Sequence, residues 1–508
     1  MRARSATLDP GSFVPAPPMV TPALKRLGKH SAIYALGPAV QKGIGFLLLP
    51  LVTAYIGGRA NYGVTEMAAV TIAIAAQVFG INLLHGMTRY YKEYEHEAER
   101  ARLVSTTLLL LLGSTGIALA LAVVFRERGA ELLFGGREYA PALVATAAIL
   151  VVQTVGQVGL RWLQILERSV VYGLLTTAKL VFEVGLKVWF LVGLDLAYMG
   201  VFYSVLGGEA LIAVGVGVAV VRRLGLRFST PIARRLVRYS YPLFFSGLCM
   251  FALHQADRYF LLRSHGEAAV GVYALGYKLG AIGNTVFLEA FGLIWFPYAF
   301  GVRDPQELAA VCRRVLALFT LLLCAVTLAL ALFRREIVAA VAPLEYAEAA
   351  LVLPIVAASA LAWGIFQIVH TAFYLRERTG TVSLLVAAAA VLNLALNAWL
   401  IPAHGYLGAA WSTLATFVAL AVGAWVVAER VMPVGYEPGR VLTPIAVTGL
   451  LFALSLFAPD GRGAAAIASR LVLLLAFPAA LAFGGYLDDG EKEKMRALLR
   501  HWIPTTRR

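Results

Sequence analysis

Long apolar stretches recur along this chain from residue 31 to residue 487, and only short polar or glycine- and proline-bearing breaks separate them. Each stretch is long enough for a helix that crosses roughly 30 Å of hydrocarbon at about 1.5 Å per residue. The composition agrees, because 60% hydrophobic and 14% charged residues lie far from the roughly 25% charged residues of soluble proteins. These features predict an all-α polytopic membrane protein and exclude a soluble multidomain chain.

The apolar pattern predicts about 14 transmembrane helices, with boundaries accurate to a few residues. The predicted spans are 31–56, 63–86, 104–125, 140–160, 169–192, 196–221, 240–262, 270–300, 308–333, 347–372, 380–401, 407–428, 441–458 and 464–487. Residues 1–30 are rich in proline and basic residues and lack the apolar core of a signal peptide. We expect that segment to be a disordered tail.

Lysine and arginine are distributed unevenly over the predicted loops. The tails and loops on the side of the N-terminus hold 30 of the 44, the opposite loops hold nine, and five lie within predicted spans. Cytoplasmic loops carry an excess of Lys and Arg, so both termini are predicted to be cytoplasmic, as expected for a multi-pass protein of the cell inner membrane. The same rule accounts for the net charge of +15 without nucleic-acid binding.

An internal repeat is visible in the sequence. Residues 58–64, after the first span, and residues 266–272, after the seventh, both spell G-x-A-x-x-G-V at a separation of 208 residues. Each motif closes the first hairpin of a six-helix unit, and repeats whose first spans lie six apart have the same orientation in the membrane. The repeat therefore predicts two homologous six-helix lobes and a final helix pair.

The predicted organisation follows from the spans and the repeat. It consists of a cytoplasmic tail (1–30), an N-terminal lobe (31–221), a basic cytoplasmic linker (222–239), a C-terminal lobe (240–428), helices 13 and 14 (429–487) and a basic cytoplasmic tail (488–508).

Two stretches resemble a known family. The first runs from Gly37 to Tyr91 and includes Lys42, the Phe-Leu-Leu-Leu-Pro run at 46–50 and the Arg-Tyr-Tyr ending at 89–91. The second is Ala-Asp-Arg-Tyr at 256–259, followed by Val-Gly-Val-Tyr-Ala at 270–274. Both resemble polysaccharide-transporter (oligosaccharide flippase) proteins, relatives of multidrug antiporters and lipid II flippases, and the similarity covers most of residues 31–430. The resemblance implies two six-helix bundles around a central cavity that moves undecaprenyl-diphosphate-linked oligosaccharide across the inner membrane.

Ionisable residues inside the predicted spans are expensive, because a charge at the bilayer centre costs roughly 2.5–3.5 kcal/mol on insertion scales. They are therefore expected to face protein or water rather than lipid. Three of them, at 179, 183 and 187, share one face of the fifth helix. The set comprises Lys42, Glu66, Lys179, Glu183, Lys187, Glu209, Asp257, Arg258, Lys278 and Glu289.

The cations in this set suit the diphosphate that the resemblance implies, because ammonium and guanidinium groups donate charge-assisted hydrogen bonds to phosphate oxygens. The alternative is that the charges pair internally and hold helices together, with Glu183 and Lys187 as the obvious pair. The candidates for a cationic substrate site are Lys42, Lys179, Lys187, Arg258 and Lys278.

The carboxylates are candidates for ion coupling to Na⁺ or H⁺, or for lining the cavity. The sequence does not choose among them. Drug-extruding relatives commonly use an acidic residue in the first helix, whereas this first helix holds only Lys42. A lysine there favours an anionic substrate. The candidate carboxylates are Glu66, Glu183, Glu209, Asp257 and Glu289.

Uncharged polar residues recur at helical spacing. Gln153 and Gln157 form one i, i+4 pair, and Asn393 and Asn397 form another. In a bilayer such pairs join helices by hydrogen bonds worth roughly 0.6–2 kcal/mol each. The alternative is that these four side chains contact sugar hydroxyls in the cavity.

Signals for other chemistry are weak. Cys249, Cys312 and Cys324 are odd in number and lie in or beside apolar runs, so they indicate neither a disulfide framework nor a metal site. No metal-ligand spacing or phosphate-binding loop is present, and no cofactor is expected. The longest predicted outer loop, about 126–139, is too short for the extracytoplasmic catalytic groups of a polymerase or glycosyltransferase.

The sequence therefore favours a non-enzymatic flippase that works by alternating access. It would carry undecaprenyl-diphosphate-linked oligosaccharide, a repeat unit of O-antigen, capsule or exopolysaccharide, from the cytoplasmic to the outer leaflet. Such a head group cannot cross hydrocarbon unaided. Its expected partners are the lipid-linked substrate, membrane lipids, Na⁺ or H⁺, and the polysaccharide polymerase machinery. The alternatives are a lipid II flippase and a drug/cation antiporter, with a membrane glycosyltransferase or polymerase less favoured.

Overall fold

The computed structural model describes residues 43–80, 82–302, 304–459, 461, 463–483 and 486. The two predicted tails, the start of the first predicted span and Lys42 lie outside these ranges. All regular structure in the described part of the chain is helical.

The helices begin and end as follows. The first half of the chain contains α2 (Leu49–Tyr55), α3 (Arg59–Val78), α4 (Leu83–Tyr91), α5 (Glu97–Val124), α6 (Arg126–Phe134), α7 (Ala140–Ile165), α8 (Ser169–Val188), α9 (Ala197–Ile212), α10 (Val218–Leu224) and α11 (Thr230–Gly280). The second half contains α12 (Glu289–Gly301), α13 (Pro305–Leu332), α14 (Arg334–Val341), α15 (Ala349–Val369), α16 (Thr371–Leu375), α17 (Thr379–Val431), α18 (Pro438–Ser455) and α19 (Ala464–Phe483).

Nine helices in the described ranges are long and apolar enough to cross a membrane, or ten if α3 and α4, which meet at a 50° bend, form one span. The sequence predicted about 14. Part of the difference arises because α11 and α17, of 51 and 53 residues, each contain all or part of two predicted spans. Another part arises because α8, a predicted span with three charged residues, is not among the nine.

Glycine marks the break inside each of the two longest helices. Gly266 in α11 has φ 79° and ψ 178°, and Gly405 in α17 has φ 55° and ψ −133°. A positive φ is open to glycine at little cost and strained for other residues. The chain therefore turns at these two positions, and each half of α11 and of α17 is an independent stretch of helix.

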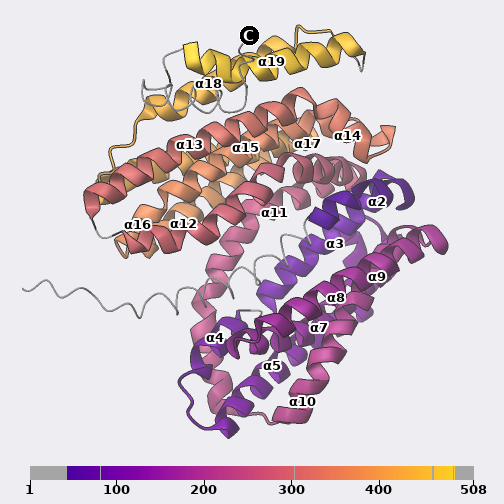
Figure 1. The fold of residues 1–508 in the computed structure, drawn as a ribbon. Helices are drawn as coiled ribbons and strands as arrows, with labels where there is room; N and C mark the ends of the chain where they lie inside the picture. Colours follow the sequence, from indigo (N-terminus) through magenta and orange to yellow (C-terminus); the bar gives the residue numbers. More distant parts are fainter. Residues whose placement is uncertain are drawn as a thin grey trace, which may run out of the picture.

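Figure 1 shows the helices in two groups. The first group, coloured indigo to magenta, contains α3 to α10, and the second, coloured pink to orange, contains α12 to α17. Helix α11 begins against the first group and ends in the second, and α18 and α19 lie beside α13 on the second group. Each group has its own buried apolar core, and two further buried clusters join α3 to the second half of α11 and to α15.

The two copies of the sequence repeat lie against each other where the groups meet. A Cβ atom built on Gly63 would lie 1.9 Å from the carbonyl oxygen of Glu267, and one built on Gly271 would lie 2.0 Å from the carbonyl oxygen of Arg59. The contact is reciprocal, because each glycine faces the second residue of the other copy. These two glycines allow the backbones of α3 and α11 to approach more closely than any side chain would permit.

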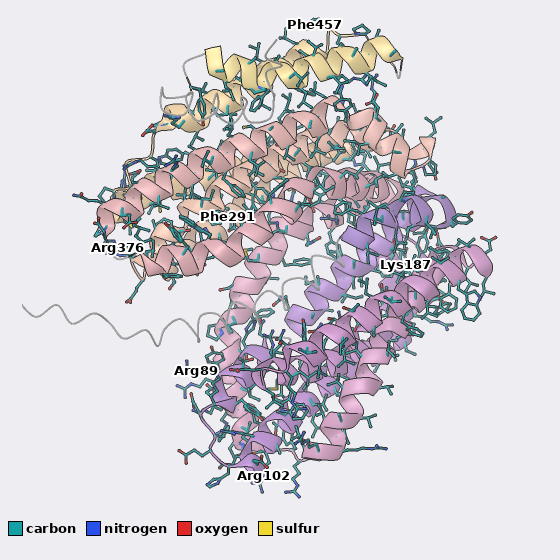
Figure 2. All side chains as sticks on the ribbon, in the orientation of Figure 1. Arg89, Arg102, Lys187, Phe291, Arg376 and Phe457 are labelled. Atoms are coloured by element: carbon teal, nitrogen blue, oxygen red, sulfur yellow. The ribbon has the colours of Figure 1, made fainter. Side chains whose placement is uncertain are left out.

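Further contacts lie close to this glycine contact, where α2 and α3 meet the second group. The Thr53 hydroxyl donates a hydrogen bond of 2.7 Å to the carbonyl oxygen of Val341, and Arg59 lies 3.5 Å from the carboxylate of Glu348. All four residues lie at or beside helix ends predicted to face outward. Figure 2 shows Arg89 of the first group and Arg376 of the second on the left of the view, away from Lys187.

Candidate functional site

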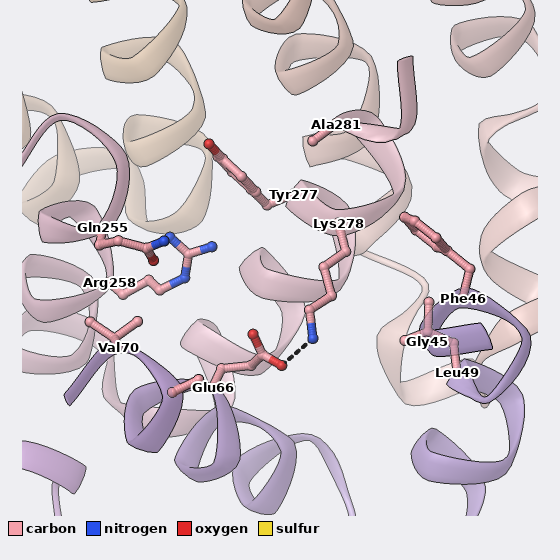
Figure 3. A pocket seen from close by; sticks show the side chains of 11 residues that line it. Gly45, Phe46, Leu49, Glu66, Val70, Gln255, Arg258, Tyr277, Lys278 and Ala281 are labelled. Atoms are coloured by element: carbon pink, nitrogen blue, oxygen red, sulfur yellow. Dashed lines mark hydrogen bonds and ion pairs between the residues drawn. The ribbon is translucent and has the colours of Figure 1, made fainter. Parts of the chain in front are cut away.

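A cavity of about 420 Å³ lies between α3 and α11. Glu66 and Val70 line it from α3, and the segment at 45–49 lines it from the start of the described chain. Both halves of α11 contribute, with Gln255 and Arg258 before the Gly266 break and Tyr277 and Lys278 after it. Figure 3 shows the Arg258 and Lys278 side chains on different turns of α11, with Glu66 between them on the facing helix.

Lys278 is bound to α3 by its ammonium group. Its Nζ atom forms an ion pair with the carboxylate of Glu66 and donates a hydrogen bond of 3.2 Å to the Tyr62 hydroxyl. The Glu66 side chain is 13% exposed, whereas that of Lys278 is 41% exposed. The Lys278 ammonium therefore has one side on α3 and another on the open volume of the cavity.

Arg258 is more enclosed. Its side chain is 5% exposed and that of the neighbouring Asp257 is 4% exposed, and they form an ion pair of 3.2 Å. The guanidinium stacks over the ring of Tyr277 at 4.8 Å, and the Tyr273 hydroxyl donates a hydrogen bond to the second carboxylate oxygen of Asp257. The Nε atom of Arg258 is buried and has no hydrogen-bond partner among the residues that the structure describes. A planar guanidinium held in place with a free N–H group is arranged to bind a further acceptor.

The other two candidate cations lie away from this cavity. Lys179 on α8 forms an ion pair of 2.6 Å with Glu209 on α9, and their side chains are 18% and 6% exposed. Lys187 forms an ion pair of 3.2 Å with Glu183, one turn earlier on α8. Gly208 on α9 packs on the Glu183 side chain, since a Cβ built there would lie 3.1 Å from it. The Lys179–Glu209 pair therefore joins α8 to α9, whereas the Lys187–Glu183 pair lies within α8.

The polar pairs at helical spacing differ from each other. Asn393 and Asn397 are buried in α17, where the Asn397 amide donates to the Asn393 side-chain oxygen at 2.8 Å and the Asn393 amide donates to Thr416 at 3.3 Å. They join the two halves of α17. Gln153 and Gln157 instead line a cavity of only about 20 Å³ within the first group.

Two predicted site residues fall outside what the structure describes. Lys42 precedes the first described residue, and the side chain of Glu289 is not described although its backbone begins α12. Of the fourteen candidate site residues, the structure brings Glu66, Arg258 and Lys278 to one cavity, with Asp257 behind Arg258.

Sequence reasoning missed Tyr277, Tyr273 and Gln255 as parts of this site. The signal was present in the spacing, because Tyr273 and Tyr277 are one turn apart and Tyr277 adjoins Lys278. Tyrosines near span ends are common at the membrane interface, so this spacing alone does not distinguish a site residue. In the structure the Tyr273 ring is fully buried and both rings lie near the Arg258 guanidinium.

Metal chemistry has no support in the described ranges, where no group of three or more His, Cys, Asp or Glu side chains is arranged to hold an ion. What the cavity offers is a pair of cations with aromatic and amide neighbours. That set can bind an anionic head group by charge-assisted hydrogen bonds.

Solved transporters share this fold. The lipid II flippase MurJ, in an inward closed conformation, superposes with a TM-score of 0.69 at 11% identity, over 91% of this chain and 100% of that chain. A multidrug resistance MATE family transporter of the MOP superfamily, in an inward-facing conformation, has a TM-score of 0.61 at 15% identity, over 81% of this chain and 99% of that chain. A mutant of the Vibrio cholerae MATE transporter VcmN has a TM-score of 0.53 at 19% identity, over 81% and 98%.

The sequence comparison with curated proteins found no match. Residues 27–301, just over half of the chain, match the family described as polysaccharide biosynthesis protein. That range includes both copies of the repeat and all the cavity residues on α3 and α11, and the match confirms the resemblance noted from the sequence. The chain is therefore a multi-pass membrane protein that has the fold of the MOP-superfamily transporters and belongs to the polysaccharide biosynthesis protein family.

Proposed function

We propose that the protein is a non-enzymatic flippase of the cell inner membrane that moves undecaprenyl-diphosphate-linked oligosaccharide from the cytoplasmic to the outer leaflet by alternating access. The observation that carries the proposal is the cavity between α3 and α11, where Arg258 and Lys278 present two cations at one site. A diphosphate is the part of such a substrate that hydrocarbon excludes most strongly, and paired cations replace its hydration.

The architecture that we propose keeps fourteen spans, both termini in the cytoplasm, two six-helix lobes at about 31–221 and 240–428, and a final helix pair. The reciprocal contact of Gly63 and Gly271 supports two equivalent lobes. In this arrangement the glycine contact closes the cavity toward the outer side, and the lobes separate there when the substrate leaves.

Lipid II is the rival substrate, since it shares the diphosphate and the prenyl chain, and the MurJ-like fold favours keeping it as an alternative. A drug/cation antiporter is less well supported, because the two carboxylates at this cavity, Glu66 and Asp257, are each already paired with a cation.

Binding of undecaprenyl diphosphate to the purified protein in neutral-lipid nanodiscs tests the proposal. Changing Arg258 and Lys278 together to Gln removes the charge-assisted contacts and should weaken binding at least about tenfold. Arg263→Gln is the matched control, because Arg263 is an exposed cation on the same helix and does not line the cavity. Equal binding by wild type and the double variant would refute the cationic site. Competition between lipid II and a lipid-linked oligosaccharide for binding then shows which of the two is the preferred substrate.

A further inference from the structure

Glu66 stands out because it places a carboxylate inside a cavity whose other charges suit an anion. A carboxylate beside a bound diphosphate repels it, since like charges a few ångströms apart in a low-dielectric site are costly. The Glu66 side chain is nevertheless largely buried and turned to Lys278 rather than to solvent (Figure 3). Its position therefore calls for a role other than substrate contact.

We propose that Glu66 is a positioning residue that occupies Lys278 as an internal counter-anion when the cavity is empty, and that an anionic head group displaces it. This inference rests on the proposed function. When Lys278 turns to the substrate, the ion pair that ties α3 to α11 is lost, and the adjoining contact of the two helices weakens. Binding is thereby coupled to separation of the two helix groups.

The spacing along the two helices places the pair beside the glycine contact. Glu66 lies one turn after Gly63 on α3, and Lys278 lies two turns after Gly271 on α11. Tyr62, which accepts a hydrogen bond from Lys278, adjoins Gly63 directly. A change at the ion pair is therefore transmitted to the point where the backbones meet.

The charge pattern is not a consequence of the repeat. At the separation of 208 residues, Glu66 corresponds to Ala274 and Lys278 corresponds to Val70. The glycines are present in both copies, whereas each charge occurs once. The apolar Ala274 and Val70 occupy the equivalent positions in the other copies, so packing of the two helices does not by itself require charged residues there.

Two measurements test the proposal. The first is binding of undecaprenyl diphosphate in phosphatidylcholine nanodiscs, for which Glu66→Gln should tighten binding about five- to tenfold because Lys278 no longer has a competing partner. Glu183→Gln is the matched control: it also removes a partly buried carboxylate paired with a lysine, but outside the cavity. Glu66→Asp keeps the charge and should stay close to wild type.

The second measurement is the distance between spin labels at Leu132 on α6 and Leu344, which are both exposed and lie in segments predicted to face outward. The labels are attached to cysteines in a variant whose three native cysteines are alanine. Glu66→Gln without ligand should shift the population toward longer distances, as undecaprenyl diphosphate does in the wild type. A charge swap, Glu66→Lys with Lys278→Glu, should restore the wild-type distance.

The outcomes separate the inference from the proposed function. If the wild-type protein binds no undecaprenyl diphosphate, the proposed substrate class is refuted. The label distances measured without ligand then test the role of the Glu66–Lys278 pair independently of the substrate. Distances that are the same in wild type and Glu66→Gln overturn the inference, as does weaker binding by Glu66→Gln. A purely structural pair would lower thermal stability in that variant and leave both readouts unchanged.

Discussion

Replacing Gly63 with alanine should force α3 and α11 apart. The added Cβ atom would lie 1.9 Å from the carbonyl oxygen of Glu267, where ordinary contact begins at 3.4 Å. The obstacle is backbone and cannot rotate away, so the helices must separate by about 1.5 Å, the difference of those two distances. Overpacking of this kind costs about 1–3 kcal/mol. The closed conformation is therefore expected to lose about 5- to 150-fold relative to a separated one.

Labelling of a cavity cysteine measures this shift. Val70→Cys, in a background without native cysteines, places a thiol in the cavity, and a membrane-impermeant maleimide added outside intact cells reports access from that side. Gly63→Ala should raise the labelling rate, and Gly271→Ala should do the same, because its Cβ would lie 2.0 Å from the Arg59 carbonyl oxygen.

The control for this experiment is Gly113→Ala. Gly113 lies on an exposed face of α5, and a Cβ built there would meet no packing neighbour among the described residues within 4 Å. Alanine there should improve helix propensity by up to about 1 kcal/mol and leave labelling unchanged. Wild-type labelling rates in well-folded Gly63→Ala and Gly271→Ala proteins would refute the view that this contact closes the outer side.

Three further predictions concern stability and topology. Lys179→Ala leaves the buried Glu209 carboxylate unpaired and should lower the free energy of unfolding by about 3–5 kcal/mol. The melting temperature should fall, and the double variant Lys179→Met with Glu209→Met should recover it. An unchanged melting temperature in Lys179→Ala would contradict the pairing. Asn393→Ala removes the buried hydrogen bond to Thr416 in the other half of α17 and the one from Asn397 in the same half. It should cost about 1–3 kcal/mol in the same assay without weakening undecaprenyl diphosphate binding. A reporter fused at residue 130 should lie outside the cell and one fused at 435 inside, and the reverse placement would break the fourteen-span proposal.

The sequence predicted interactions within a helix better than those between helices. The Glu183–Lys187 pair follows from i, i+4 spacing and is present at 3.2 Å. The partner of Lys278 lies 212 residues away and that of Lys179 lies 30 residues away, and no periodicity of a single helix encodes either pairing. Which cations stay available in a cavity depends on such distant partners, so the five candidate cations could not be ranked before the structure placed them.

The repeat also shows that contacts between distant segments could not be predicted from the sequence. Its two copies were visible because the glycines recur at a fixed separation, and the two lobes predicted from them stay a prediction. The pattern did not reveal that the two copies contact each other. A glycine in a sequence marks a permissive backbone position, whereas the neighbour that requires it, here the carbonyl oxygen of Glu267, is a property of the folded chain.

Transport in proteoliposomes shows whether the protein moves a lipid-linked oligosaccharide between leaflets. Undecaprenyl-diphosphate-linked oligosaccharide is placed in the bilayer, and an external sugar-modifying enzyme reports how fast the inner-leaflet pool becomes accessible. We expect accelerated exchange with the wild type, little acceleration when Arg258 and Lys278 are both Gln, and wild-type rates for Arg263→Gln. The absence of acceleration by the wild type, together with uptake of a cationic drug against a Na⁺ or H⁺ gradient, would contradict the proposed function.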